Sequence, residues 1–189
     1  MNIIELIKSR RTIRKFEQTP LKEEQLLNYI DAARVAPSAA NLQPLKYVVV
    51  NSREMNDKIF ENVKWAGYLA PDYNPKEDER PTAYIIVCVD KDISKNGAET
   101  DVGAAVENII LSALSEGVGA CWMGAIDRKG IGDVIRLPEN LDISCVVALG
   151  YPKENPKEVS LTDSVKYYLE DDTLCVPKRQ IDEVVVKTI

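Results

Sequence analysis

Histidine is absent from this sequence of 189 residues. Its absence excludes Ser-His-Asp and Cys-His nucleophilic catalysis, proton transfer by an imidazole and metal sites with histidine ligands. If the protein is an enzyme, we therefore expect a bound cofactor to carry its chemistry.

Cysteine is scarce, and its four residues are widely separated. They form no CxxC pair and mostly lie within apolar segments, at Cys88, Cys121, Cys145 and Cys175. This pattern favours reduced, buried thiols over a zinc site or a disulfide framework. The sequence thus predicts no metal site.

Long hydrophobic runs are also missing. The longest, such as residues 84–89, are about six residues, far short of the roughly 20 that a membrane-spanning helix requires. The amino terminus lacks a basic stretch followed by an apolar core, so no secretion signal is expected. Acidic residues outnumber basic ones by 30 to 24, which argues against a general nucleic-acid surface. We expect a soluble, cytoplasmic protein whose partners are small molecules, with no nucleic acid and no membrane among them.

The length fits a single domain, residues 1–189. Apolar periodicity, proline positions and β-branched runs predict its regular elements. Helices are expected over 3–9, between Pro20 and Pro37, and over 52–61, 101–116 and 129–137, and strands over 46–50, 83–89, 120–123 and 143–149. The helix over 101–116 has an apolar face too wide for a surface helix, so we expect it to be buried or covered by a partner.

Two segments do not fit this regular pattern. Residues 63–82 carry three aromatic residues among prolines and charges, which is typical of a surface excursion or lid. Residues 176–189 form a carboxy-terminal arm in which Val184–Val186 is strand-prone without a neighbouring partner in the sequence. Such an arm can pair with the edge of its own sheet or cross to a second subunit, which is the physical basis of an intertwined dimer.

A dense cationic cluster lies at Arg10, Arg11, Arg14 and Lys15, in a chain of net charge -6. One interpretation is that these cations only interact with the negative end of the preceding helix dipole. The other is that they bind an anion, because arginine donates charge-assisted hydrogen bonds to phosphate in a fixed geometry. A local reversal of charge sign favours the anion site.

A polar loop bracketed by prolines follows the second expected helix, at residues 37–44 with the sequence PSAANLQP. Taken alone, it is also explained as a helix stop followed by a turn whose side chains bond their own backbone. Together, the cationic cluster and this loop offer the two polar ends that a cofactor with a charged tail and a heterocyclic head requires. The conjunction is more specific than either part and predicts a flavin phosphate as the anion.

These features resemble the FMN-dependent nitroreductase family. The match runs in the family's order over residues 9–16 (SRRTIRKF), 36–44 (APSAANLQP), 103–124, 150–152 (GYP) and 177–185. The resemblance implies an α+β fold of one nitroreductase-like domain, with a central, mostly antiparallel sheet flanked by helices. It also implies an intertwined homodimer that exchanges its carboxy-terminal arms and binds FMN at the interface.

The resemblance also implies the site residues, position by position. Contacts to the phosphate and ribityl chain would come from Arg10, Arg11 and Thr12, with Lys178 or Arg179. Arg14 would lie near the pyrimidine side of the ring, where a fixed cation stabilises the negative charge of the reduced flavin. The other subunit would supply Pro37, Ser38, Ala39 and Asn41. The isoalloxazine edge would be lined by Met123, Gly124 and Ala125.

The activity implied by the resemblance is hydride transfer from NAD(P)H through FMN to a nitroaromatic, quinone or other electron-poor acceptor in a ping-pong cycle. Two alternatives remain open: a specialised flavin enzyme of the same fold (a dehalogenase, dehydrogenase or flavin-fragmenting enzyme) and a non-catalytic FMN-binding redox module. Leu45 stands where many relatives have tryptophan, and residues 63–82 match no pattern of the family, which leaves the acceptor open. The sequence does not decide between NADH and NADPH either. Stacking on an aromatic acceptor competes with ordinary packing as the role of Trp65, Tyr68 and Trp122.

Overall fold

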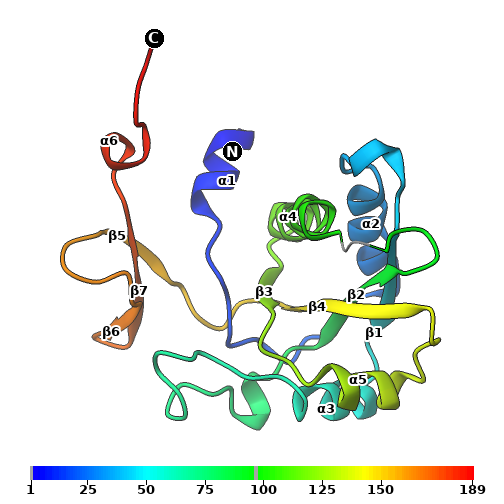
Figure 1. The fold of residues 1–189 in the computed structure, drawn as a ribbon. Coiled ribbons are helices and arrows are strands. Elements are labelled where there is room, and N and C mark those ends of the chain that lie inside the picture. Colours follow the sequence, from blue (N-terminus) through cyan, green and yellow to red (C-terminus); the bar gives the residue numbers. More distant parts are fainter. Residues whose placement is uncertain (1, 96–97) are drawn as a thin grey trace.

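The computed structural model describes residues 2–95 and 98–189. Its centre is a four-stranded antiparallel sheet (Figure 1), which in spatial order consists of β1 (Leu45–Val50), β2 (Ala83–Asp90), β4 (Leu141–Gly150) and β3 (Gly119–Met123). The helices in chain order are α1 (Ile3–Ser9), α2 (Glu23–Arg34), α3 (Arg53–Phe60), α4 (Glu99–Ser115), α5 (Arg128–Ile135) and α6 (Ile181–Val184). The expected α+β organisation is confirmed.

Helices cover both faces of the sheet, with α2 and α4 on one side and α3 and α5 on the other (Figure 1). Alternate side chains of β2 enter two separate cores. Ile85 and Val87 pack with α2 and α4, whereas Tyr84 and Ile86 pack on the side of α3 and α5. Because β2 and β4 are covered on both faces, their sequences are continuous apolar runs.

α4 is buried along a wide face, as its sequence predicts. It packs against α2 and against the sheet. The buried apolar side chains are Val102, Ala105, Val106, Ile109, Ile110 and Ala113. This packing places the amino end of α4 beside the loop that precedes β1, where Asp101 contacts Ser38.

α1 forms as predicted but projects from the domain (Figure 1). Asn2 caps it by accepting a hydrogen bond from Glu5 N at 3.0 Å. Its apolar residues Ile3, Ile4 and Ile7 are 63%, 62% and 47% exposed. The apolar face of this helix therefore stays open to solvent in the single chain.

A second sheet of three strands lies apart from the main one (Figure 1). Its spatial order is β5 (Lys157–Ser160), β7 (Thr173–Lys178) and β6 (Tyr168–Glu170). The sequence did not predict it, because β5 and β6 are only four and three residues long and partly charged, and the apolar stretch of β7 is short and contains Pro177. The strand-prone Val184–Val186 is not a strand in the single chain: Val184 ends α6, and residues 185–189 have no regular structure.

Residues 63–82 are mostly irregular and include one short 3-10 helix at Glu77–Glu79. The segment is more than a surface excursion. Trp65 and Tyr73 are only 5% and 6% exposed and belong to the core on the side of α3 and α5, whereas Tyr68 is 54% exposed. The buried side chains of Trp65 and Tyr73 therefore attach this segment to the core, and the loop between them exposes Tyr68.

All four cysteines are buried, free thiols, as expected. Among the described residues, no cluster of side chains has the composition of a metal site. A search of the same residues finds no helix with the length and apolar character needed to span a bilayer.

Candidate functional site

The cationic segment Arg10–Lys15 leaves α1 and runs along β3, an edge strand of the main sheet. Ile13 N donates to the Ala120 carbonyl at 3.0 Å, and Thr12 forms a parallel bridge with Ala120. Ile13 is buried over Gly119, where an added Cβ would lie 2.7 Å from Ile13 Cγ1. Glycine permits this close approach. The predicted cations are thus fixed along one edge of the sheet.

Arg10 and Arg11 make different contacts. Arg10 Nε lies 3.7 Å from Glu107 Oε1 on α4. The Arg11 guanidinium forms an ion pair with Glu158 on β5 and donates from Nη1 to the Lys8 carbonyl at 3.0 Å. Its Nε is buried and has no hydrogen-bond partner among the described residues. An unpaired buried donor costs about 1–3 kcal/mol, so this nitrogen is suited to an acceptor that the polypeptide does not supply.

The Arg14 guanidinium lies over the ring of Tyr167, with Cζ 4.6 Å from the ring centroid. Tyr167 in turn contacts Tyr68, with ring centroids 4.9 Å apart, and its hydroxyl accepts a hydrogen bond from Tyr68 N at 3.4 Å. The backbone N–H of Arg14 donates to the Glu154 carboxylate. A cation–π contact of this kind holds the cation without using its N–H donors in conventional hydrogen bonds, so they can serve a ligand.

The predicted ring-edge residues lie at the end of β3, and the 63–82 segment packs beside them. Met123 is buried, whereas Gly124 and Ala125 are exposed. Lys64 N donates to the Ala125 carbonyl at 3.0 Å. A Cβ added at Gly124 would meet no heavy atom within 4 Å, so open space adjoins this backbone. Residues 64–68 therefore connect the end of β3 with the tyrosine pair on which Arg14 rests.

The predicted polar loop is held in shape by a buried carboxylate. Asp101, only 5% exposed in the first turn of α4, accepts hydrogen bonds from the Ser38 hydroxyl and from Ala39 N, the latter at 3.1 Å. Ser38 Oγ also accepts from Gln43 N at 2.9 Å. Left-handed backbone angles, with φ of 49°, 54° and 53°, occur at Ala40, Asn41 and Gln43. This conformation is costly without glycine, so the loop is strained and requires these contacts.

The loop and the cationic segment lie at opposite edges of the sheet. The loop leads into β1, the cationic segment follows β3, and β2 and β4 separate the two edges. Strands lie about 4.8 Å apart, so these three intervals amount to roughly 14 Å. A cavity of about 230 Å³ adjoins the loop and is lined in part by Pro37, Ser38 and Asp101. One chain does not bring the two halves together, and the supply of the loop by a second subunit stays a prediction.

Lys178 and Arg179 lie at the end of β7, where both are exposed. Arg179 Nη1 is 3.6 Å from Glu183 Oε1 in the carboxy-terminal arm. β7 pairs with β5, the strand that carries Glu158, the ion-pair partner of Arg11. The small sheet that Arg11 contacts therefore also carries both predicted carboxy-terminal cations.

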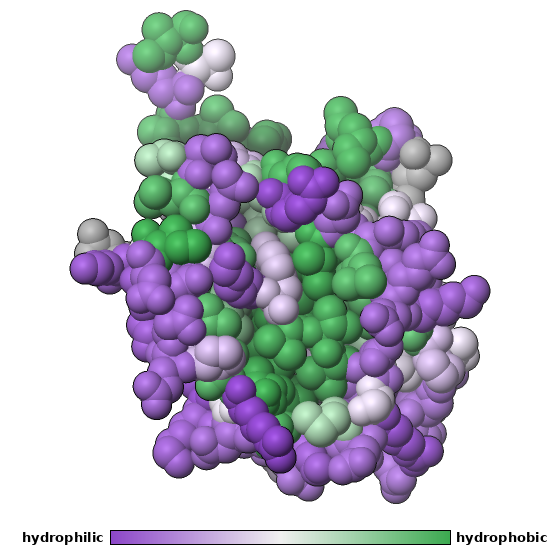
Figure 2. Space-filling view, turned by 90° about the vertical axis from the view of Figure 1, so that its right-hand side faces the viewer, coloured by the Kyte–Doolittle hydropathy of each residue, from purple (hydrophilic) through white to green (hydrophobic). Residues whose placement is uncertain are grey.

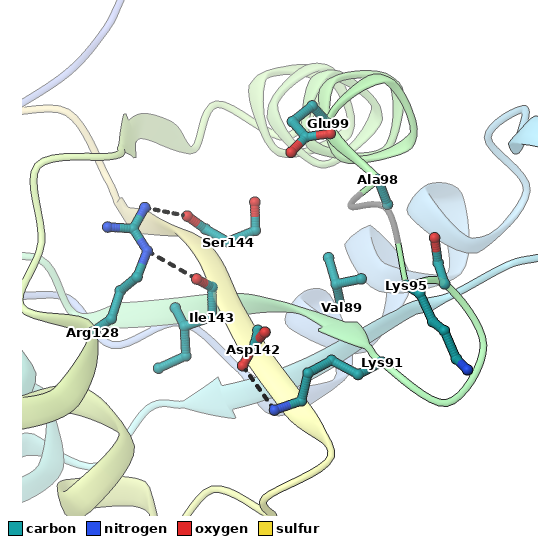
Figure 3. A pocket seen from close by; sticks show the side chains of 10 residues that line it. Val89, Lys91, Lys95, Ala98, Glu99, Arg128, Asp142, Ile143 and Ser144 are labelled. Atoms are coloured by element: carbon teal, nitrogen blue, oxygen red, sulfur yellow. Dashed lines mark hydrogen bonds and ion pairs between the residues drawn. The ribbon is translucent and has the colours of Figure 1, made fainter.

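A larger cavity, of about 660 Å³, lies between the amino end of α4 and the start of β4 (Figure 3). Lys91 in its wall pairs with Asp142 at 3.2 Å, and Arg128 donates to two backbone carbonyls of β4 at 3.0 and 2.9 Å. Figure 3 shows the Lys95 ammonium pointing away from Arg128. These cations do not converge on one point, and the described lining residues include none of the predicted site. The residues along β3 are therefore the stronger candidate for a functional site.

The thiols near β3 are unsuited to nucleophilic chemistry. Burial raises the pKa of Cys121 to about 11, and burial likewise raises the pKa of Cys145 to about 11. Burial raises the pKa of Cys88 to about 12. Such thiols are protonated at neutral pH, and the protonated form is a poor nucleophile. With neither histidine nor a thiolate, the site depends on a bound group for its chemistry.

Sequence reasoning missed the acidic residues that hold the site in place. Asp101 and Glu154 each accept hydrogen bonds from backbone N–H groups of a predicted site segment. Glu154 lies just beyond the GYP motif at residues 150–152, and Asp101 begins the long helical pattern. The sequence drew attention to the segments that contain both residues. No sequence pattern, however, indicates which distant backbone groups a carboxylate will bind.

Comparisons with known proteins agree with this geometry. The model of the Nitroreductase family matches residues 7–151. A protein of Methanothermobacter thermautotrophicus, provisionally named NADH dehydrogenase/NAD(P)H nitroreductase, is 37% identical over 176 residues, covering 90% of this chain and 87% of that protein. A protein of Archaeoglobus fulgidus with the same provisional name is 35% identical over 158 residues, covering 80% of this chain and 86% of that protein.

Solved structures share the fold. A structure from Parabacteroides distasonis, with the same provisional name, has a TM-score of 0.70 at 26% identity and covers 90% of this chain and 99% of its own. A provisionally named nitroreductase from Desulfovibrio desulfuricans, in complex with FMN, has a TM-score of 0.71 at 20% identity. The alignment covers 100% of this chain and 98% of that one. Because the family model spans most of the sequence, the chain belongs to the nitroreductase family.

Proposed function

We propose that the protein is an FMN-dependent oxidoreductase that takes hydride from NAD(P)H and passes it, in a ping-pong cycle, to a nitroaromatic, a quinone or another electron-poor acceptor. The observation that carries this proposal is the buried Arg11 Nε, which has no acceptor among residues 2–95 and 98–189, on the same sheet edge as the open backbone at Gly124. Membership of the family and the FMN bound by the D. desulfuricans protein support the cofactor.

The residues along β3 fit FMN from end to end. Arg10 and Arg11 offer cations at one end, close to Thr12 and its bridge partner Ala120. Gly124 lies four residues beyond Ala120, roughly 13 Å further at about 3.3 Å per strand residue. This length suits a cofactor with a phosphate at one end and a planar ring at the other. Gly124 then lets the ring approach the backbone closely.

Bound FMN supplies the hydride transfer, for which the side chains along β3 have no equivalent. The contribution of the chain is to bind and orient. Arg11 neutralises phosphate charge with hydrogen bonds that are stronger than neutral ones. Arg14 places a fixed positive charge on the pyrimidine side, where negative charge gathers on reduction.

We further propose that the working form is a homodimer. Figure 2 views the side of the molecule on which α2 and β1 lie in Figure 1, and hydrophobic surface occupies the middle of this face. β1 is an edge strand, and its Tyr47, Val48 and Val49 are only partly buried. The arm exposes apolar side chains, with Ile181 at 75% and Val186 at 100%. An arm from a second subunit that pairs with β1 would cover both surfaces.

An absorbance spectrum of the purified protein tests cofactor and reducibility together. We expect a yellow protein with the spectrum of bound FMN, bleached by anaerobic NADH or NADPH and recoloured by a nitroaromatic or a quinone. A colourless protein that FMN does not reconstitute, and that oxidises no NAD(P)H, overturns the proposal. Bound flavin that neither nucleotide reduces would instead indicate a non-catalytic redox module.

A further inference from the structure

Glu154 clamps the backbone of the cationic segment. It lies beyond the end of β4, where residues 150–154 run beside residues 13–17. One carboxylate oxygen, Oε1, accepts from the backbone N–H of Arg14 and, at 3.2 Å, from that of Lys15. The other, Oε2, accepts from the hydroxyl of Tyr73. A single side chain thus joins β4, the cationic segment and the 63–82 segment.

Tyr73, whose side chain lies in the core, holds the Glu154 carboxylate through its hydroxyl. It is 6% exposed, and its ring lies under the Lys15 ammonium at 4.5 Å from the centroid. Burial and, next, the hydrogen bond to Glu154 raise the pKa of Tyr73 above its usual value. The hydroxyl therefore keeps its proton and remains a donor to the carboxylate. Without Tyr73, Oε2 would lose the partner that fixes the plane of the carboxylate.

The charge of Glu154 cannot be its contribution to binding an anionic cofactor, because a carboxylate beside a phosphate or a reduced flavin repels it. Its contribution is instead to hold the backbone of Arg14 in place. Charge-assisted bonds fix the Arg14 backbone, and the Tyr167 ring contacts the Arg14 guanidinium at the other end of the side chain. With both ends held, Arg14 can direct its N–H donors in only a narrow range of directions.

We propose that Glu154, held by Tyr73, is a positioning residue that aims the Arg14 guanidinium at the pyrimidine side of the flavin. This inference rests on the proposed function. It assigns a purpose to the buried part of the 63–82 segment, namely to deliver the Tyr73 hydroxyl to Glu154. It also predicts the sign of an effect on the bound cofactor, which a structural role alone would not.

The decisive measurement is the reduction potential of FMN bound to Glu154→Gln. We expect the equilibrium constant for two-electron reduction to fall at least tenfold, which corresponds to a potential about 30 mV lower, because a misaligned Arg14 stabilises the reduced flavin less. If Glu154 acted through its charge, its removal would ease reduction and raise the potential. A potential that rises, or one that stays at the wild-type value while only thermal stability falls, overturns the inference.

Two further variants keep the test decisive. Tyr73→Phe removes only the hydroxyl and should lower the equilibrium constant in the same direction by a smaller factor; it decides the matter if Glu154→Gln fails to fold or to retain FMN. Glu79→Gln is the matched control, because Glu79 pairs with Lys15 at 3.7 Å and loses the same charge without touching the Arg14 backbone. An equal decrease in the control contradicts positioning by Glu154.

A double-mutant cycle separates this inference from the proposed function. In an Arg14→Ala background, Glu154→Gln should produce no further decrease, because its effect passes through Arg14. Equal effects in both backgrounds overturn the inference while leaving the proposed function intact. Wild-type protein that binds no FMN overturns the proposed function itself.

Discussion

The Ser38 hydroxyl donates a hydrogen bond to the buried carboxylate of Asp101. This contact joins the loop before β1 to the first turn of α4, where the positive end of the helix dipole favours a carboxylate. The Ser38 oxygen simultaneously accepts from Gln43 N. The hydroxyl is therefore engaged on both sides, and its main contribution to the site is the shape of the loop.

Replacing Asp101 with asparagine should lower the free energy of unfolding by about 1–3 kcal/mol, because the amide cannot accept from both loop donors and leaves a buried polar group unpaired. Urea unfolding of the FMN-free protein at fixed concentration measures this loss. Glu99→Gln, exposed in the same helical turn, is the control and should cost under about 1 kcal/mol. Equal losses would show that the loop contacts contribute nothing.

Arg11→Ala should weaken FMN binding by about 10- to 100-fold, since a hydrogen bond to a charged group contributes about 1.5–3 kcal/mol. Riboflavin has the same ring without the phosphate, so its affinity should change little. Fluorescence titration of the FMN-free protein with both flavins measures the difference. A parallel loss of riboflavin affinity would indicate that Arg11 contacts the ring or only supports the fold.

Gly119→Ala should destabilise the protein by about 1–3 kcal/mol, because the new Cβ is forced into Ile13 and moves the cationic segment away from β3. Weaker FMN binding should accompany the loss. Gly132→Ala on α5 provides the control, since its Cβ would meet only Leu137 Cβ, at 4.0 Å, and alanine favours a helix by about 0.5–1 kcal/mol. Unfolding of both variants in urea tests this contrast.

Removal of residues 181–189 should convert the proposed dimer to a folded monomer that binds FMN poorly. Every one of these residues is exposed in the single chain, so the core loses nothing. Light scattering after size exclusion gives the mass, and circular dichroism verifies the fold. A truncated protein that remains a dimer would refute exchange of the arm as the source of association.

High pH should destabilise the protein. Burial raises the pKa of Cys88 from 9.0 to about 12 and that of Cys121 from 9.0 to about 11. Above pH 9 the unfolded chain releases these thiol protons while the folded chain keeps them, so the free energy of unfolding falls as pH rises. Urea unfolding between pH 7.5 and about 9.5, below the range in which tyrosine ordinarily titrates, measures the trend, which would be absent there if the thiols titrated normally. A thiol reagent at pH 8 should also label the native protein far more slowly than the unfolded protein.

The main sheet and its helices were predictable because their side chains repeat with clear periods. β2 and β4 are apolar runs of strand length, and α4 combines helical spacing with a broad apolar face. Local patterns of this kind reflect burial directly. The same reasoning failed for β5 and β6, whose mostly exposed residues carry no alternation that burial would impose, and for β7, whose buried Leu174 and Cys175 are adjacent rather than alternating.

The candidate site was predictable only in part. Charge and composition were enough to identify the arginines and the polar loop as candidate site segments. The structure places the arginines along β3. Glu154, Tyr73 and Tyr167 escaped notice because their roles come from contacts across 81 to 153 residues of sequence. Pairings at that separation depend on tertiary packing, which leaves no short-range signature.

The open edge of β1 has a consequence for the life of the newly made chain. In the single chain this edge strand displays unpaired backbone groups beside apolar side chains, a template on which other unfinished chains can add. Slow synthesis, low expression temperature or a chaperone that shields this strand should therefore raise the yield of soluble protein. The proposed sharing of one site by two polypeptides would thus leave each chain vulnerable to aggregation for an interval after it leaves the ribosome.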